Sequence, residues 1–200
     1  MITPAEPVSA KGRRRRAEIL EAAETLLIEE GYAGFSMRKL ADQIGIRLSN
    51  VQYYYATPNA VIEALFEQAL EGARVELEAD DTADLASLVH YAFGSQDNAR
   101  SCRLFWELWA LSARDDGAAR IVDRFYMAYR DAIEQRIHAL LPRMPAAARR
   151  RRAILIMSLL EGLSLFRGHG RGLAGTGAAL DRDALNAVLA LARLPQGKTE

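Results

Sequence analysis

The sequence has little of several features that mark whole classes of protein. Its 200 residues include one cysteine, Cys102, which excludes an internal disulfide and fits a reducing compartment. Lysine and arginine together number 26, as do aspartate and glutamate, so the zero net charge argues against a general polyanion binder. No apolar run approaches the roughly 18 residues that a membrane span needs, and residues 1–10 lack the apolar core of a signal peptide. We therefore expect a cytoplasmic chain that does not enter a membrane.

Patterns typical of enzymes and metal sites are also scarce. His90, His138 and His169 lie far apart in the sequence, without the spacing of metal ligands. No nucleophile–base arrangement stands out. Residues 170–175 have the letters of a dinucleotide fingerprint, but they follow an expected helix rather than a strand, so a loop is favoured. We expect no catalytic residue, no metal and no cofactor.

Helical patterns dominate what is present. Half of the residues are hydrophobic, apolar positions recur at three-to-four spacing, and few strand-like alternations occur. The sequence predicts an all-α protein of about nine helices with a glycine-rich connector at 168–177. The expected helices span about 12–30, 37–44, 47–55, 58–78, 82–94, 98–114, 117–141, 146–166 and 181–194.

Residues 36–55 have the features of a helix-turn-helix. Ser36 stands at an N-cap position before a short apolar stripe, and Gly45 can adopt the left-handed conformation that ends a helix. The second helix has only Val51 and Tyr55 as an obvious inward pair. Its other side chains are polar or aromatic, which suits the second helix of such a motif in a DNA major groove.

Two runs of arginine provide local positive charge. Residues 13–16 are four arginines near the start of the first helix, where cations oppose the helix dipole unless phosphates face them. Residues 149–152 are four more, which we interpret as the solvated end of a helix; a second DNA contact is the less favoured alternative.

Six short segments between Ile19 and Leu65 carry a family resemblance. In order they are Ile19-Leu20-Glu21-Ala22-Ala23, Gly31-Tyr32, Met37-Arg38-Lys39-Leu40-Ala41, Gly45-Ile46, Val51-Gln52-Tyr53-Tyr54-Tyr55 and Ala60-Val61-Ile62-Glu63-Ala64-Leu65. Their order and spacing resemble the DNA-binding domain of the tetracycline-repressor (TetR) family. The chain departs from the family at Arg47, where Ser or Thr is common, at Ser49-Asn50 and Tyr54, and at Pro58, where many members have lysine.

The resemblance implies which residues contact DNA. We expect Leu48, Ser49, Asn50, Gln52 and Tyr53 near the bases. The residues expected to contact the DNA sugar–phosphate backbone, or to support such contacts, are Arg13, Arg14, Arg15, Arg16, Ser36, Arg38, Arg47 and Tyr54.

Aromatic residues form a second cluster, further along the chain. Plain core packing and a ligand pocket are equally favoured for them, since aromatic walls with a few polar groups are typical of small-molecule sites. The resemblance implies an effector cavity in this region. The candidate ligand-binding residues are Phe105, Trp106, Trp109, Phe125, Tyr126, Tyr129, Met157 and Glu161. For Glu161, exposure at the rim or a salt bridge is favoured over ligand contact; if it faces the pocket, the ligand is a cation or a hydrogen-bond donor.

Residues 153–166 are apolar almost all round, which predicts burial on more than one side. The resemblance implies that this helix and the last one form a four-helix bundle with a second copy. The expected interface residues are Ile154, Met157, Leu165, Leu185, Val188 and Leu189.

Together these features predict a bacterial, nucleoid-associated regulator that binds operator DNA as a homodimer and responds to a small molecule. The expected divisions are a tail at 1–11, a DNA-binding domain at 12–57, a ligand-binding and dimerisation domain at 58–195, and a tail at 196–200. A repressor whose helix 58–78 transmits ligand binding is favoured. An activator of the same fold, an all-α enzyme and an interaction scaffold are the alternatives.

Overall fold

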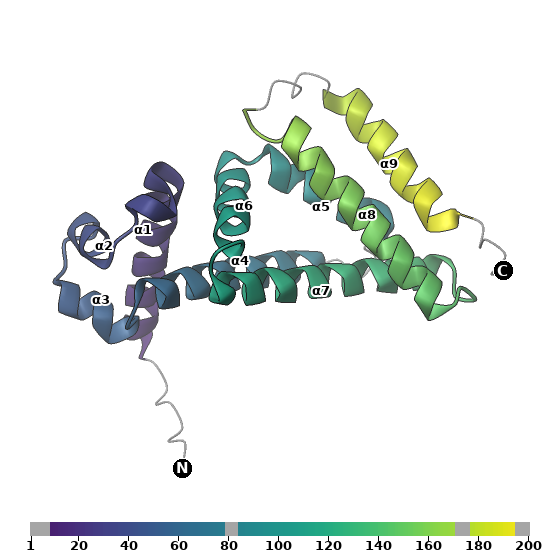
Figure 1. The fold of residues 1–200 in the computed structure, drawn as a ribbon. Helices are drawn as coiled ribbons and strands as arrows, with labels where there is room; N and C mark the ends of the chain where they lie inside the picture. Colours follow the sequence, from purple (N-terminus) through teal and green to yellow (C-terminus); the bar gives the residue numbers. More distant parts are fainter. Residues whose placement is uncertain (1–8, 79–83, 171–176, 195–200) are drawn as a thin grey trace, which may run out of the picture. The chain divides into compact units, whose positions relative to one another are not determined.

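The computed structural model describes residues 9–78, 84–170 and 177–194, and within them every regular element is an α-helix. The helices are labelled in Figure 1. Residues 1–8 of the expected tail at 1–11, the expected tail at 196–200, the expected helix start at Thr82 and most of the glycine-rich connector lie outside these residues. Residues 10 and 11 of the expected tail belong to the first helix. The bounds are α1 Ala10–Gly34, α2 Met37–Gln43, α3 Leu48–Tyr54, α4 Pro58–Glu78, α5 Leu85–Asp97, α6 Ala99–Ser112, α7 Asp116–Leu140, α8 Ala146–Arg167 and α9 Gly177–Arg193.

The helices group into two compact units. The N-terminal unit extends to Ala69 and also includes Glu107–Ile121, and the C-terminal unit comprises Leu70–Trp106 and the chain from Val122 onward. Helices α4, α6 and α7 therefore contribute residues to both units. These units differ from the expected division at residue 57, because the first turns of α4 and the segment joining α6 to α7 pack with the N-terminal helices.

Local signals determine the N-terminal helix ends. The Ser36 hydroxyl accepts a hydrogen bond from the Lys39 amide at 3.2 Å, and the Thr57 hydroxyl accepts one from the Ala60 amide at 3.1 Å. Gly45 has φ 67°, the left-handed conformation expected for the turn. Gly31 also has φ 67° and kinks α1, but the helical segment resumes and ends at Gly34 rather than near Glu30.

Helices α5 and α9 have bounds that differ from the expected ones. Helix α5 begins after Asp84, whose carboxylate accepts a hydrogen bond from the Ser87 amide at 2.9 Å, and it ends at Asp97 rather than Gly94. Helix α9 begins at Gly177, four residues before the expected Asp181. Helix α6 begins at Ala99, one residue after the expected Asn98, and the Asn98 side chain accepts a hydrogen bond from the Ser101 amide at 3.1 Å.

The C-terminal unit has one core, formed by α5, α7, α8 and α9. Its fully buried side chains include Leu88, Ile133, Ile156, Leu160 and Val188. Helices α8 and α9 lie side by side (Figure 1). One face of α8 packs into this core, while its other face keeps exposed apolar side chains, which are Ile154, Leu155, Leu165 and Phe166.

The sequence predicts that the arginine run at the start of α8 is solvated, and the structure shows that one of the four arginines is buried. Arg152 is buried, and its guanidinium donates hydrogen bonds to the carbonyls of Ala192, at 3.2 Å, and Leu194. These carbonyls at the end of α9 lack helical donors, so Arg152 caps that helix. Arg150, by contrast, is exposed and pairs with Glu134 at 3.3 Å.

Candidate DNA-binding and ligand-binding sites

Few side chains of helix α3 are buried, and most of the others are exposed to solvent. Val51 is fully buried and Tyr55, just after the helix, is 6% exposed. Tyr53 is 82% exposed, and its ring meets the half-buried Tyr54 ring edge-on at 5.1 Å. Of the other predicted base-contacting residues, Leu48 is half-buried and the exposed ones are Ser49, Asn50 and Gln52. The exposed face of α3 is therefore polar and aromatic.

Arg47 and Arg38 flank this face as exposed cations. Arg47 stands at the N-cap of α3 and makes no capping hydrogen bond through its side chain, as its chemistry requires. Arg38 is exposed on α2 and forms no ion pair with a described residue, whereas the neighbouring Lys39 pairs with Glu30. Ser36 is half-buried and its hydroxyl serves as the cap of α2.

Arg14, Arg15 and Arg16 of α1 each contact a neighbour within the N-terminal unit. Glu18 pairs with Arg14 at 3.1 Å and with Arg15 at 2.8 Å. The Arg16 guanidinium lies over the Tyr55 ring, 5.3 Å from its centroid. Burial raises the pKa of the Tyr55 hydroxyl, and the Arg16 charge lowers it. Arg16 thus fixes the start of α1 against the end of α3.

A chain of hydrogen bonds in the N-terminal unit was missed from the sequence. The Tyr32 hydroxyl donates to the Asn59 side-chain oxygen at 2.9 Å, and the Asn59 amide group donates to Asp115 at 2.8 Å. Asp115 also accepts from the Ala118 amide at 2.8 Å, and Glu107 accepts from the Tyr32 amide at 3.2 Å. The end of α1, the start of α4 and the α6–α7 junction are joined in this way. No sequence pattern indicates these partners, which lie 27 to 75 residues apart.

Part of the predicted ligand set does come together in the C-terminal unit. The Phe125 ring lies 5.2 Å from Phe105, 5.1 Å from Tyr126 and 5.8 Å from Tyr129, measured between centroids. The Tyr126 hydroxyl donates to the Glu161 carboxylate at 3.3 Å. Helices α6, α7 and α8 supply these side chains.

Glu161 is half-buried, and its position at the rim of a pocket stays a prediction. It forms no ion pair with a described residue, and Tyr126 is its donor. Burial raises the pKa of Glu161 from 4.5 to about 7, against a smaller opposite effect of the Tyr126 hydrogen bond. A carboxylate in such a setting attracts a cation or a donor.

The Tyr129 hydroxyl is buried without a hydrogen-bond partner, on the same side of α7 as Tyr126, the donor to Glu161. The residue is 9% exposed. Burial raises its pKa most, followed by the charge of Glu161 and the neighbouring hydroxyls of Tyr126 and Tyr91. A buried hydroxyl without a partner is uncommon in proteins and calls for an explanation.

The other members of the predicted ligand set are the two tryptophans and Met157. Trp109 belongs to the N-terminal unit. Trp106 lies against Gly168, where an added Cβ would be 3.3 Å from its ring. Met157 is half-buried and packs against the core of the C-terminal unit. The sequence does not indicate that Trp106 and Trp109, both on α6, belong to different units.

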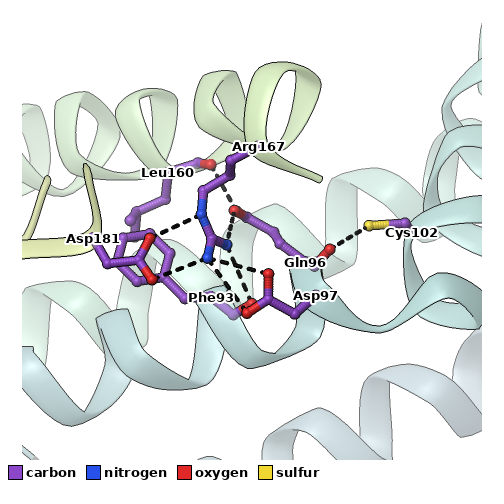
Figure 2. A network of polar contacts seen from close by, with 7 residues as sticks. All are labelled: Phe93, Gln96, Asp97, Cys102, Leu160, Arg167 and Asp181. Carbon is purple, nitrogen blue, oxygen red and sulfur yellow. Dashed lines mark hydrogen bonds and ion pairs between the residues drawn. The ribbon is translucent and has the colours of Figure 1, made fainter. Parts of the chain in front are cut away.

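A second polar cluster, also missed, surrounds Arg167 at the end of α8 (Figure 2). Its guanidinium pairs with Asp97 at 3.2 Å and Asp181 at 3.0 Å, and it donates to the Gln96 side chain at 3.0 Å. The Gln96 carbonyl accepts from the Cys102 thiol at 2.8 Å. The cluster borders a hollow of about 370 Å³, but Arg167 and its two aspartates already pair with one another. We assign it a structural role.

The predicted interface residues separate into surface and core. Ile154 and Leu165 are each 45% exposed, and Leu185 and Leu189 are half-buried on α9. Val188 is fully buried in the core of its own chain, so its side chain does not reach a surface that a second copy could contact.

These features define a class of protein. An exposed polar second helix after a tight turn, with flanking cations, is a helix-turn-helix DNA-binding site. No helix among the described residues is long and apolar enough to cross a membrane. In the same part of the chain, no three His, Cys, Asp or Glu side chains come together to hold a metal.

Comparison with known proteins identifies the family. Residues 19–65 match the model of bacterial regulatory proteins of the tetR family, and residues 82–191 match that of the C-terminal domain of BetI-type transcriptional repressors. The chain belongs to the TetR family and is a DNA-binding transcriptional regulator rather than an enzyme.

Individual relatives agree with this assignment. An HTH-type transcriptional regulator from the dhlA 5′ region of Xanthobacter autotrophicus is 29% identical over 176 residues, which is 82% of this chain and 86% of that protein. Salmonella enterica GusR has the same fold, with TM-score 0.76 and 16% identity over 96% of this chain and 99% of its own. A Saccharomonospora viridis protein solved in complex with choline has TM-score 0.71 and 17% identity, over 88% of this chain and 96% of its own.

Proposed function

We propose that the protein is a homodimeric repressor that a small molecule releases from its operator. The observation that carries this proposal is the exposed face of α3, where Tyr53 is 82% exposed and only Val51 is buried within the helix. A helix with so little core contact and so many polar side chains is suited to a DNA groove.

In this proposal the α3 face specifies the sequence, while the cations position the protein on DNA. Gln52, Asn50 and Tyr53 contact base edges, and Arg38 and Arg47 contact phosphates. Gln52→Ala is expected to change sequence preference, and Arg38→Ala is expected to weaken binding to all sequences and to reduce its salt dependence. The reverse result in gel shifts with operator and scrambled DNA would reject this division.

Dimerisation gives the exposed apolar face of α8 a partner. Ile154, Leu165 and Phe166 are 45%, 45% and 56% exposed, which is unusual for large apolar side chains on one helix. A second copy related by a two-fold axis would cover them and supply the second recognition helix for a palindromic operator. The proposed interface comprises Ile154, Leu165, Leu185 and Leu189, with Met157 at its edge.

Effector binding among Phe105, Phe125, Tyr126, Tyr129 and Glu161 is proposed to act on the N-terminal unit through α4, α6 and α7. These helices contribute residues to both units, and the Asn59–Asp115 hydrogen bond joins the start of α4 to the α6–α7 junction at 2.8 Å. The choline complex of the Saccharomonospora viridis protein supports a small organic ligand in a domain of this fold. The ligand must prefer the state that does not bind DNA, typically by about 1–3 kcal/mol.

The deciding experiment is a gel shift with DNA from upstream of the protein's own gene and of its neighbours. The full chain is expected to shift one such fragment as a dimer, and an effector is expected to release it. Asn59→Ala is expected to leave effector affinity unchanged while reducing this release. A bound ligand that leaves operator affinity unchanged contradicts the coupling, and a reporter gene that loses expression when the regulator is deleted indicates an activator instead.

A further inference from the structure

We propose that the effector is a protonated amine with N–H donors, held by Glu161 and Tyr129 among the aromatic rings of α7. This inference rests on the proposed function, because it names the chemical class of the molecule that the C-terminal unit binds. Its basis is a half-buried carboxylate with a single donor, Tyr126, and a buried hydroxyl without a partner three residues further along α7.

The carboxylate is short of donors. Glu161 accepts one hydrogen bond from Tyr126 at 3.3 Å and has no ion pair among the described residues. An ionised carboxylate offers about four acceptor positions, so most of its capacity is unused. Partial burial raises the pKa of Glu161 to about 7, against the smaller opposite effect of the Tyr126 hydrogen bond. A cation beside it would compensate for the lost hydration and would favour the ionised form.

The hydroxyl supplies a second acceptor on the neighbouring helix. Tyr129 lies on α7 and is 9% exposed, and its oxygen has no hydrogen-bond partner. Tyr129 follows Tyr126, the donor to Glu161, by three residues on α7, so both tyrosines lie on the same side of this helix. One ammonium group with two or more N–H donors can reach both oxygens, and a buried polar group of this kind gains most from a partner.

The rings around these oxygens suit the rest of such a ligand. Phe125 lies between Phe105, at 5.2 Å, and Tyr129, at 5.8 Å, and Tyr126 completes the group at 5.1 Å. Aromatic faces attract a cation and shield its organic substituent from water. The cluster therefore combines apolar walls with one negative group.

This arrangement selects among ligand classes. A quaternary ammonium such as choline, the ligand of the Saccharomonospora viridis protein, has charge but no N–H donor for Glu161 and Tyr129. A neutral alcohol has one donor and no charge, and an anion is repelled by Glu161. A primary or secondary ammonium satisfies the charge and both acceptors.

The test uses the full-length protein and four probes that share a phenyl ring: benzylammonium, benzyltrimethylammonium, benzyl alcohol and benzoate. Isothermal titration calorimetry near neutral pH measures each affinity. Benzylammonium is expected to bind at least about tenfold more tightly than each of the others, which corresponds to about 1.4 kcal/mol.

Three variants locate the selectivity. Glu161→Gln is expected to weaken benzylammonium binding about tenfold or more and to leave benzyl alcohol binding unchanged. Tyr129→Phe is expected to narrow the preference for benzylammonium over benzyltrimethylammonium. Asp123→Asn, an exposed carboxylate on the same helix α7, is the control and should change neither. Thermal unfolding of each variant verifies that it is folded.

Several outcomes overturn the proposal. They are equal or tighter binding of benzyltrimethylammonium, benzyl alcohol or benzoate, unchanged benzylammonium affinity in Glu161→Gln, and no saturable binding of benzylammonium. The proposed function fails separately. If a neutral or anionic molecule releases the operator, the regulator assignment stands and the amine class is wrong. If benzylammonium binds through Glu161 without changing operator affinity, the amine class stands and the coupling is wrong.

Discussion

Two charged side chains of α8, Arg167 and Glu161, are both withdrawn from solvent but differ in how well they are paired. The Arg167 guanidinium is 7% exposed and pairs with Asp97 and Asp181, and it donates to the carbonyl of Phe93 at 3.3 Å. Glu161 has a single donor, Tyr126, and an unpartnered hydroxyl nearby, that of Tyr129. A buried charge with a full set of partners stabilises a fold, whereas a buried charge with few partners is available for a ligand. The comparison yields four predictions.

The largest effect is expected at Arg167. Arg167→Met keeps an apolar side chain of similar length but leaves Asp181 and Gln96 without their main partner. The buried Gln96 side chain and Phe93 carbonyl lose their donor, at a cost of about 1–3 kcal/mol each. The ion pairs with the partly exposed Asp97 and Asp181 are lost as well, so the urea midpoint should fall strongly. Arg182→Met, at an exposed position on α9, is the matched control and should stay near the parent. Similar midpoints for the two variants would mean that the Arg167 cluster does not hold α5, α8 and α9 together.

The second prediction concerns the pH dependence that Glu161 creates. Its pKa is raised from 4.5 to about 7 in the folded chain, so the native state binds more protons than the unfolded state between these values. Stability is therefore highest below about pH 4.5 with respect to this group, and it falls as the pH rises through about 7. Glu161→Gln removes this loss. Its free energy of unfolding, relative to that of the parent, should therefore rise by up to about 3 kcal/mol across that pH range.

Urea unfolding at several pH values, with and without the Glu161→Gln change, measures this difference. Asp123→Asn should follow the parent, since Asp123 is exposed on α7. A constant difference between Glu161→Gln and the parent from acid to neutral pH would show that Glu161 is ionised at little cost and is already well paired.

The sequence predicted the DNA-binding motif in residue detail because its signals are local. Ser36 and Thr57 cap the helices that follow them, and Gly45 adopts the left-handed turn, each through atoms a few residues away. Arg47 likewise fails to cap because of its own chemistry. For such features, neighbouring residues contain all the information that the fold uses.

The C-terminal site could be predicted only in outline, because its partners are distant in sequence. The sequence predicts Glu161 at a rim but does not indicate its hydrogen-bond donor, Tyr126, which lies 35 residues away on α7. Arg152 was expected in solvent, and it caps the end of α9, 40 residues away. No sequence pattern indicates the ion pairs of Arg167, because Asp97 lies 70 residues before it and Asp181 lies 14 residues after it. Composition and hydrophobic periodicity do not predict contacts between residues so far apart in the sequence.

The third prediction tests how closely the Arg167 region is packed. A Cβ added at Gly168 would lie 2.4 Å from the Ser164 carbonyl oxygen and 3.4 Å from the Cys102 sulfur. Gly168→Ala must displace the chain that follows Arg167, at a cost of about 1–3 kcal/mol. Gly94→Ala is the control, because nothing lies within 4 Å of the added Cβ in α5, and it should stabilise the helix by about 0.5–1 kcal/mol. If urea unfolding gives Gly168→Ala the same unfolding free energy as the parent, this end of α8 can move without loss of stability.

The smallest effect on stability is expected at Tyr129. Tyr129→Phe removes a hydroxyl that has no partner in the folded chain, so its unfolding free energy without ligand should stay within about 1 kcal/mol of the parent or rise slightly. Tyr126→Phe is the contrast, because it removes the donor to Glu161 and should be the less stable of the two. Urea unfolding compares the pair, and calorimetry with benzylammonium then measures the affinity of each. A loss well above 1 kcal/mol in Tyr129→Phe would mean that its hydroxyl is satisfied in the free protein, by an ordered water for example. In that case the hydroxyl would not be an acceptor held in reserve for a ligand, and Glu161 alone would have to bind the amine.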